Sequence, residues 1–507
     1  MTQTIQERGS AAAAPVEGER PTGGGLLVLY LALGGLAFAC LQSLVSPALS
    51  TIGHELGAST ADTSWVVTAY LLSASVLTPI LGRLGDMIGK RKVLVGVLAT
   101  LAVGTLVAAL ATNLTVLIVA RVLQGASGAI LPLSLGMVRD ELPRKRVPTT
   151  VAILSAISGI GAGIGIVAAG PIVEHLSWHW LFWLPLALVV IALFGAVFGM
   201  KESPVRTPGK LDWSGAIILS VTLVALLMGI SKGQAWGWDD AKTIGLLALG
   251  VVGLLAFVLI ELRVKEALVD MRLMRNRAVW ATDLVALIMG FAMFGAFLVI
   301  PMLLQLPPAL GGFGKPVSQI GLYLLPTVIG LIVFGVVAGA LVRKFGPKLP
   351  MVLGATLVTV AFAIPAIAHD QIWHLLLSGS LTGAGIGLSF AAMSNAIIEA
   401  VPATQTGQAT SVNAIARTIG SSIGTAVIAA IISAKVTPAG RPHRRSVHHR
   451  VLDLLRHRRP GDHRGPRRAV GPPPPRAVGR RRRRRPATRA GRAAPAAPQA
   501  LLTFGTA

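Results

Sequence analysis

Cysteine and charge are both scarce in this chain of 507 residues, and each scarcity excludes a class of protein. The single cysteine, Cys40, excludes an internal disulfide and any metal site built from several cysteines. Charged residues make up only 13% of the chain, whereas a soluble globular protein carries about 25%. Hydrophobic residues make up 53%, and the mean hydropathy is +0.70. This composition predicts an all-α polytopic membrane protein.

The first 25 residues also lack the pattern of a secretory signal peptide. They are polar and rich in glycine and alanine, and no basic segment leads into a short apolar one. We interpret residues 1–25 as a disordered leader in the cytosol.

Thirteen apolar runs follow the leader. Most contain about 20 residues or more, which is enough to cross a hydrocarbon core of about 30 Å. They predict thirteen spanning helices. The runs are 26–50, 63–82, 93–111, 114–138, 149–173, 180–200, 213–231, 243–262, 280–304, 318–342, 349–368, 374–398 and 409–433.

Basic residues orient these helices. If the N-terminus is cytosolic, the cytosolic connections carry 21 lysines and arginines and the outer connections carry 4. Such a bias is the positive-inside pattern of a plasma (inner) membrane protein. The bias also supports the number of spans, because one missed helix would scramble the alternation.

The chain contains an internal repeat. Residues 82–92, GRLGDMIGKRK, match residues 339–349, GALVRKFGPKL, and GAGIG at 161–165 matches GSSIG at 420–424. The repeat length of about 258 residues predicts two six-helix units with two extra helices between them, an arrangement typical of secondary transporters. The predicted domains are the leader 1–25, an N-terminal six-helix bundle 26–200, two linker helices with their loops 201–278, a C-terminal bundle lacking its last span 279–436, and a basic low-complexity tail 437–507.

The connection between the second and third runs carries the most specific motif. Gly82 and Gly89 permit a tight turn, Asp86 can cap a helix, and Lys90 and Arg91 favour the cytosolic side. The cations alone would be ordinary for an inside loop. The whole set resembles the signature loop of the major facilitator superfamily, in which the aspartate gates the cytosolic side by contacting the other half.

Three further stretches narrow the resemblance. WVVTAYLL at 65–72, RVLQG at 121–125 and the glycine-rich GIGAGIGIVAAGP at 159–171 are similar to those of the 14-span drug:proton antiporters. The resemblance implies a major-facilitator fold with two six-helix pseudo-repeats and two linker helices, of which 13 of 14 spans are present. It implies a proton-coupled exporter of small amphipathic compounds or drugs that works by alternating access.

Such a protein is not an enzyme and has no catalytic residue, no metal and no cofactor beyond the proton gradient. Its partners would be a small-molecule substrate, protons and the lipid bilayer, with no nucleic acid, and it would be a monomer. The rival hypothesis is a non-transporting membrane receptor or scaffold that acts through the basic tail.

The resemblance assigns proton transfer to Arg121, which lies inside a span, with Gln124 one turn away on the same face. The alternative for Arg121 is an arginine that snorkels to the surface. The first span lacks the carboxylate usual in the family, so Asp283 becomes the candidate coupling residue. Asp283 could instead be an interfacial carboxylate paired with Arg275 or Arg277.

Arg417 also lies within a span, and it could pair with Glu399, with Asp283 or with an anionic substrate. Few acids accompany the two intramembrane arginines, which favours neutral or anionic cargo. The predicted cavity lining comprises Gln42, Tyr70 and Asn413.

The glycine-rich run has the spacing of a closely packed helix and no preceding strand, which excludes a nucleotide-binding loop. In the antiporters this helix seals the transport path against leaks. The residues of this predicted glycine helix are Gly161, Gly165, Gly170 and Pro171.

The tail differs from the rest of the chain. From Arg441 onward it holds 19 arginines, six of them consecutive at 480–485, and no lysine. Its residues are mostly those with GC-rich codons, so we hypothesise that a GC-rich gene is read out of frame after Gly440, where a fourteenth span should follow. The protein would then be an impaired transporter. The alternative is a disordered basic tail that binds anionic lipid.

Overall fold

The computed structural model describes residues 24–207, 209–264, 266–308, 312–368 and 370–433, and all regular secondary structure in these ranges is helical. Residues 1–23 of the predicted leader 1–25 and the whole predicted tail 437–507 lie outside the described residues, as does the position predicted for a fourteenth span. The last two residues of the predicted leader, Gly24 and Gly25, begin α1 and are helical. The helices are α1 (Gly24–Ser43), α2 (Val45–Glu55), α3 (Thr60–Thr63), α4 (Trp65–Ile88), α5 (Lys90–Ala109), α6 (Leu114–Gln124), α7 (Ile130–Glu141), α8 (Val147–His175), α9 (Trp180–Phe194), α10 (Trp213–Trp236), α11 (Ala241–Glu261), α12 (Met271–Met274), α13 (Arg277–Gln305), α14 (Val317–Phe345), α15 (Lys348–Ile367), α16 (Ile372–Ala400) and α17 (Thr406–Ser433).

Twelve helical segments in the described part of the chain are long and apolar enough to cross a membrane, and they coincide with the first twelve predicted runs. The thirteenth run, 409–433, lies within α17, which is a helix of 28 residues but is not among those twelve. A count of 13 spans out of 14 therefore stays a prediction.

Two predicted spans are interrupted helices. The first breaks at Leu44, between α1 and α2, and the fourth passes through a 3₁₀ turn at Gly125–Ala129 that joins α6 to α7. Apolar composition predicts burial in the bilayer, but it does not reveal where the backbone changes its hydrogen-bonding pattern.

The signature loop is much shorter than predicted. Helix α4 continues to Ile88 and α5 begins at Lys90, so only Gly89 separates them. Gly89 has a φ of 122°, a backbone conformation that favours glycine, and this one residue reverses the chain. Gly82 lies inside α4, and the predicted turn at this residue is wrong.

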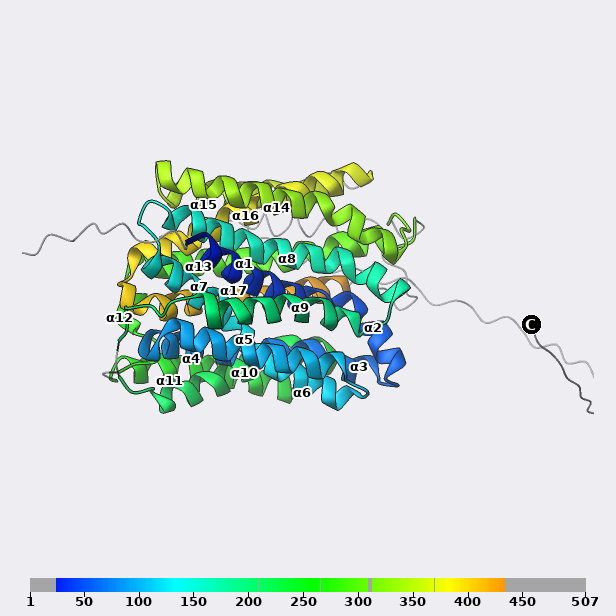
Figure 1. The fold of residues 1–507 in the computed structure, drawn as a ribbon. Helices are drawn as coiled ribbons and strands as arrows, with labels where there is room; N and C mark the ends of the chain where they lie inside the picture. The colour runs from blue at the N-terminus through cyan, green and yellow to red at the C-terminus, as the bar shows by residue number, and fades with distance from the viewer. Residues whose placement is uncertain (1–23, 208, 265, 309–311, 369, 434–507) are drawn as a thin grey trace, which may run out of the picture. The chain divides into compact units, whose positions relative to one another are not determined.

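Helices α1–α9, here called the first half, share one large apolar core. Helices α13–α17, the second half, hold several smaller buried clusters. Between them in sequence, α10 and α11 form a linker hairpin, and α10 packs against both α4 and α17. Figure 1 shows the long helices running alongside one another, with α10 next to α4 and α11 packed on α10.

The internal repeat of about 258 residues makes α14 the counterpart of α4, and α17 the counterpart of α8. Gly346, the counterpart of Gly89, ends α14 with a φ of 75°, so both glycines end a helix in the same way. Helix α4 contacts α17, and α8 contacts α14, so the repeat-related helices form two crossings between the halves.

Candidate functional site

A cavity of about 340 Å³ lies between the two halves. Its walls come from α1, α2, α4, α7, α8 and the 3₁₀ turn of the first half, from α13, α16 and α17 of the second, and from α10 of the linker hairpin. Gln42 and Tyr70 line it, in agreement with the sequence prediction. Asn413 does not line it, because its side chain is buried against α13, where the amide donates a hydrogen bond to Asp283.

Helices α4 and α17 cross each other, and the cavity lies toward their predicted outer ends. On α4 the lining residues run from Val67 to Thr78, and on α17 from Ala414 to Ala426. The parts of α4 and α17 beyond these residues, on the predicted cytosolic side, touch each other directly. The arrangement is a central cavity that is closed at the predicted cytosolic side.

Asp86 forms the centre of this closure. Its carboxylate, only 1% exposed, accepts hydrogen bonds from the backbone N–H groups of Gly407 at 3.3 Å and Gln408 at 3.1 Å. These N–H groups belong to the first turn of α17, where unpaired donors and the helix dipole favour a negative charge. Asp86 therefore contacts the other half of the molecule, as the family resemblance implies, while its gating role stays a prediction.

Lys90 is not the loop cation that its sequence position predicts. Its side chain is fully buried. Its Nζ lies 2.8 Å from Asp140 and 3.6 Å from Asp86, so two carboxylates compensate the burial of its charge. Arg91 donates hydrogen bonds to the carbonyl groups of Ala196 and Val197 and so ties the start of α5 to the end of the sixth span.

Gly82 acts by close packing. A Cβ atom at this position would lie 2.9 Å from the carbonyl oxygen of Gly407, and it would also collide with the hydroxyl group of Ser411. Ser411 donates a hydrogen bond of 3.2 Å to the carbonyl of Thr78. Only a residue without a side chain lets α4 and α17 approach this closely.

The connections of the linker hairpin reinforce the closure. Thr207 donates its N–H to the carbonyl of Asp86 at 2.8 Å and its hydroxyl to the carbonyl of Thr404 at 3.1 Å. The Gln408 amide donates to the carbonyls of Leu268 at 2.9 Å and Ala267 at 3.3 Å. These bonds attach the segments before α10 and after α11 to the start of α17.

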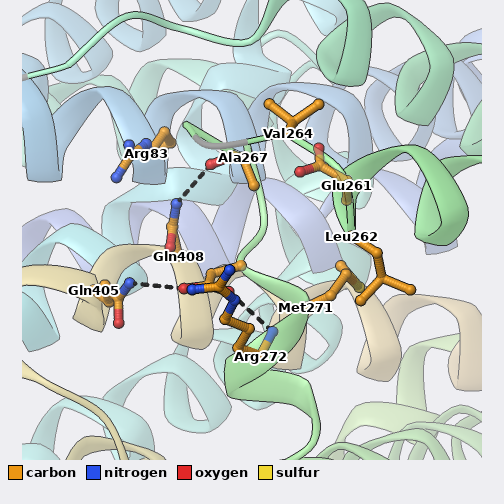
Figure 2. Close-up of a pocket in the computed structure, with 10 residues that line it drawn as sticks. Arg83, Glu261, Leu262, Val264, Ala267, Met271, Arg272, Gln405 and Gln408 are labelled. Carbon is orange, nitrogen blue, oxygen red and sulfur yellow. Dashed lines mark hydrogen bonds between the residues drawn. The ribbon is translucent and has the colours of Figure 1, made fainter.

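The same region encloses a second, small pocket of about 90 Å³ (Figure 2). Arg83 and Glu261 lie on different sides of it, and Gln408 lies below Arg83 in this view. Glu261 is 2% exposed. Glu261 is not among the site residues predicted from the sequence, although an acid at the end of the uncharged stretch 243–260 is a usable signal.

Arg121 is buried inside the first half, so the snorkelling alternative is wrong. Its guanidinium donates to the carbonyls of Val66 at 3.0 Å and Leu41 at 3.1 Å and to Gln124 Oε1 at 2.7 Å. Its Cζ lies 4.2 Å from the centre of the Tyr70 ring. Arg121 and Gln124 thus form the predicted network, but neither of them lines the cavity.

Asp283 and Arg417 do not pair. Asp283 Oδ1 accepts a hydrogen bond of 3.0 Å from Asn413 Nδ2. Arg417 lines the cavity with its Cζ 4.9 Å from the centre of the Phe390 ring. Among the described residues, the ion pairs join Lys90 to its two aspartates and include none of the predicted partners of Arg417 or Asp283, which are Glu399, Arg275 and Arg277.

The glycines of α8 pack on two sides. Gly161 and Gly165 face α1, where Cβ atoms would meet Ala39 and Ser43. The alternate glycines Gly159 and Gly163 face α14 of the other half, against Leu331 and Val328. Gly170 and Pro171 do not share in this packing, since nothing lies within 4 Å of a Cβ at Gly170 and Pro171 is exposed. These two residues lie near the end of α8, beyond the segment that crosses α1.

Comparison with known proteins gives a consistent result. The chain matches the family model described as Major Facilitator Superfamily over residues 31–425. It is 29% identical over 399 residues to the multidrug transporter protein MdtP of Bacillus subtilis, with 78% of this chain and 73% of that protein covered. It is 31% identical over 389 residues to a uridine/deoxyuridine transporter of Lactococcus lactis, with 73% of this chain and 78% of that protein covered.

A solved structure shows the same fold. The proton:xylose symporter XylE aligns with 86% of this chain and 94% of its own, with a TM-score of 0.54. At 15% sequence identity, this similarity concerns the fold alone.

Proposed function

Since the chain belongs to the Major Facilitator Superfamily and is a multi-pass membrane protein, we propose that it is a proton-coupled secondary transporter of the 14-span drug:proton antiporter branch. It exports small amphipathic compounds across the plasma membrane by alternating access, as a monomer and without a bound cofactor.

One observation carries this proposal: the central cavity is closed on one side by contacts between the two halves. Alternating access requires a site between two bundles that opens to one side of the membrane at a time. The contacts of Asp86 and Gly82 with α17 form such a closure, because they join the halves at the predicted cytosolic ends of their helices.

Proton coupling is assigned to Asp283. Its carboxylate on α13 bonds to Asn413 on α17, one turn from Arg417 in the cavity wall. A proton on Asp283 would remove the negative charge that accepts this bond and would loosen α13 from α17 near the cavity. Within the described part of the chain no carboxylate pairs with Arg121. Arg121 holds the first and second spans together through backbone carbonyls, next to Tyr70 in the cavity wall.

The relatives support a transporter but differ in cargo. One relative is named a multidrug transporter, and another is named a uridine/deoxyuridine transporter. Drug export is therefore inferred from the resemblance of the antiporter motifs. The receptor or scaffold hypothesis has no such support, and the tail on which it depends lies outside the described residues.

The proposal is tested by reconstituting the full chain in proteoliposomes and imposing a pH gradient. We expect the gradient to drive movement of amphipathic compounds from a drug panel, and Asp283→Asn to abolish this driven movement while leaving downhill exchange. The matched control is Asp370→Asn, which neutralises an exposed aspartate in a predicted outer connection. Driven transport that persists in Asp283→Asn would remove Asp283 from the coupling step.

A further inference from the structure

The charge of the cavity wall points to a class of cargo. We propose that the cavity binds amphipathic organic anions, in which an aromatic or aliphatic body carries one carboxylate, sulfonate or phosphate group, and that Arg417 determines this specificity. This inference rests on the transport function proposed above and names the substrate class of the same site.

Among the described residues that line the cavity, Arg417 is the one that carries a formal charge, and none of them is an aspartate, glutamate, lysine or histidine. The second intramembrane arginine does not line the cavity, because Arg121 is fully buried behind Tyr70. Asp283 lies outside the lining and is bonded to Asn413. The cavity wall therefore presents one cation to a ligand, and this cation attracts anions and repels other cations.

The structure holds Arg417 at this position. Gly290 on α13 packs directly on the Arg417 backbone carbonyl, where any Cβ would collide, and the same carbonyl accepts a hydrogen bond of 2.8 Å from Ser421. The guanidinium lies beside the Phe390 ring, so part of its apolar face is covered. No carboxylate among the described residues pairs with it, which leaves its donors available to a ligand.

A guanidinium suits an oxyanion because its planar donors can bond two oxygens at once. Such a bond is strong where protein and lipid exclude water, since the cation has already lost much of its hydration. A positively charged cargo would instead meet a like charge in the same confined volume.

The rest of the wall suits the body of such a compound. Hydroxyl groups of Thr418 and Ser422 lie on α17 near Arg417, while Phe38, Phe294 and Leu227 add apolar surface from three other helices. A volume of about 340 Å³ is at the lower end of the range for small-molecule sites. A ligand with one oxyanion on a compact apolar body fits this wall, because Arg417 can bind the oxyanion and the apolar side chains can contact the body.

Three probes with the same aromatic body separate charge from hydrophobicity: naphthalene-2-sulfonate, 2-naphthylmethanol and 2-naphthylmethylammonium. Their equilibrium binding is measured by scintillation proximity on the full chain in lipid nanodiscs. We expect the sulfonate to bind about tenfold more tightly than the alcohol, as one charge-assisted hydrogen bond provides, and the ammonium to bind most weakly.

Arg417→Gln should weaken sulfonate binding about tenfold, to the level of the alcohol, and leave alcohol binding within about twofold. Arg417→Lys keeps the charge and should keep the sulfonate preference. The matched control is Arg343→Gln, which removes an exposed arginine at the end of α14 and should change no probe.

Equal or tighter binding of the alcohol or the ammonium to the unaltered chain would overturn the inference. So would a sulfonate preference that survives in Arg417→Gln, or an absence of binding by all three probes. If Arg417→Gln does not fold, the ranking of the probes on the unaltered chain and on Arg417→Lys still decides. Because binding needs no pH gradient, a failure of proton-driven transport would leave this comparison intact.

Discussion

The two crossings between the halves are related by the internal repeat, yet they are built differently. Where α4 meets α17, polar contacts gather at the predicted cytosolic end and the cavity separates the rest of the two helices. Where α8 meets α14, close packing extends over most of the length, from Gly339 against Ala152 to Gly321 against Val167. We call the polar contacts at the α4–α17 crossing the latch, and the close-packed α8–α14 crossing the seam.

The counterparts of single residues show how the repeat diverged. Asp86 in α4 corresponds to Arg343 in α14. The aspartate accepts N–H groups at the start of α17, whereas an arginine cannot accept them, and Arg343 is exposed. Of the two repeat-related crossings, the one between α4 and α17 thus has the polar closure formed by Asp86. We expect the halves to separate at α4 and α17 while α8 and α14 stay in contact.

The largest expected effect comes from breaking the seam. Gly163→Leu would place a side chain against Val328 of α14, where even a Cβ is too close, and overpacking of this kind costs about 1–3 kcal/mol or more. We expect a clear drop in thermal stability, measured on the purified chain in detergent. Gly170→Leu on the same helix meets nothing within 4 Å and is the control. Equal stability of the two variants would show that the seam tolerates bulk.

The next effect comes from opening the latch. Asp86→Ala removes the acceptor for two N–H groups of α17 and one partner of Lys90, which should weaken the closure by about 1–3 kcal/mol. The reporter is Ser411→Cys in a Cys40→Ala background, because Ser411 is fully buried in the latch. Its labelling by a water-soluble maleimide in inside-out vesicles should rise about tenfold.

Arg343→Gln, at the exposed counterpart position on α14, is the control for this labelling and should leave it unchanged. Labelling that does not rise in Asp86→Ala would mean that the glycine contacts alone hold the latch closed.

The smallest effect concerns the linker hairpin. Gln408→Ala removes the hydrogen bonds to the carbonyls of Ala267 and Leu268 and should weaken the closure by about 0.5–1.5 kcal/mol. The same labelling assay should show a rise of only a few fold. Gln319→Ala, an exposed glutamine at the other side of the molecule, serves as the control. A rise as large as that of Asp86→Ala would make the hairpin an equal part of the latch.

Local features of this chain could be recognised without the structure. Twelve of the thirteen predicted apolar runs coincide with helices that are long and apolar enough to span a membrane, because burial in lipid demands long uncharged segments. Gly89 was identified as a turn residue, and the spacing of Gly161 and Gly165 indicated close helix packing. Each of these inferences depends on a few neighbouring residues and on one physical requirement.

Other features depend on residues that are far apart in the chain. Lys90 looked like a loop cation, because its burial depends on Asp140, 50 positions away. The sequence left Glu399, Asp283 and an anionic substrate open as partners of Arg417, and neither acid pairs with it among the described residues. It also predicts a turn at Gly82, which instead faces α17. A local sequence pattern does not predict which residues, far apart in the chain, will come into contact.

The sequence by itself determined the class of protein, because the hydrophobic thickness of a bilayer demands long apolar segments. It also determined the internal repeat and the chemical groups available. Only the tertiary structure decided which of these groups meet. It buried Arg121 and left Arg417 facing the cavity. The physical reason is that the effect of a charge depends on its partners and its access to water, and helix packing between the halves sets both.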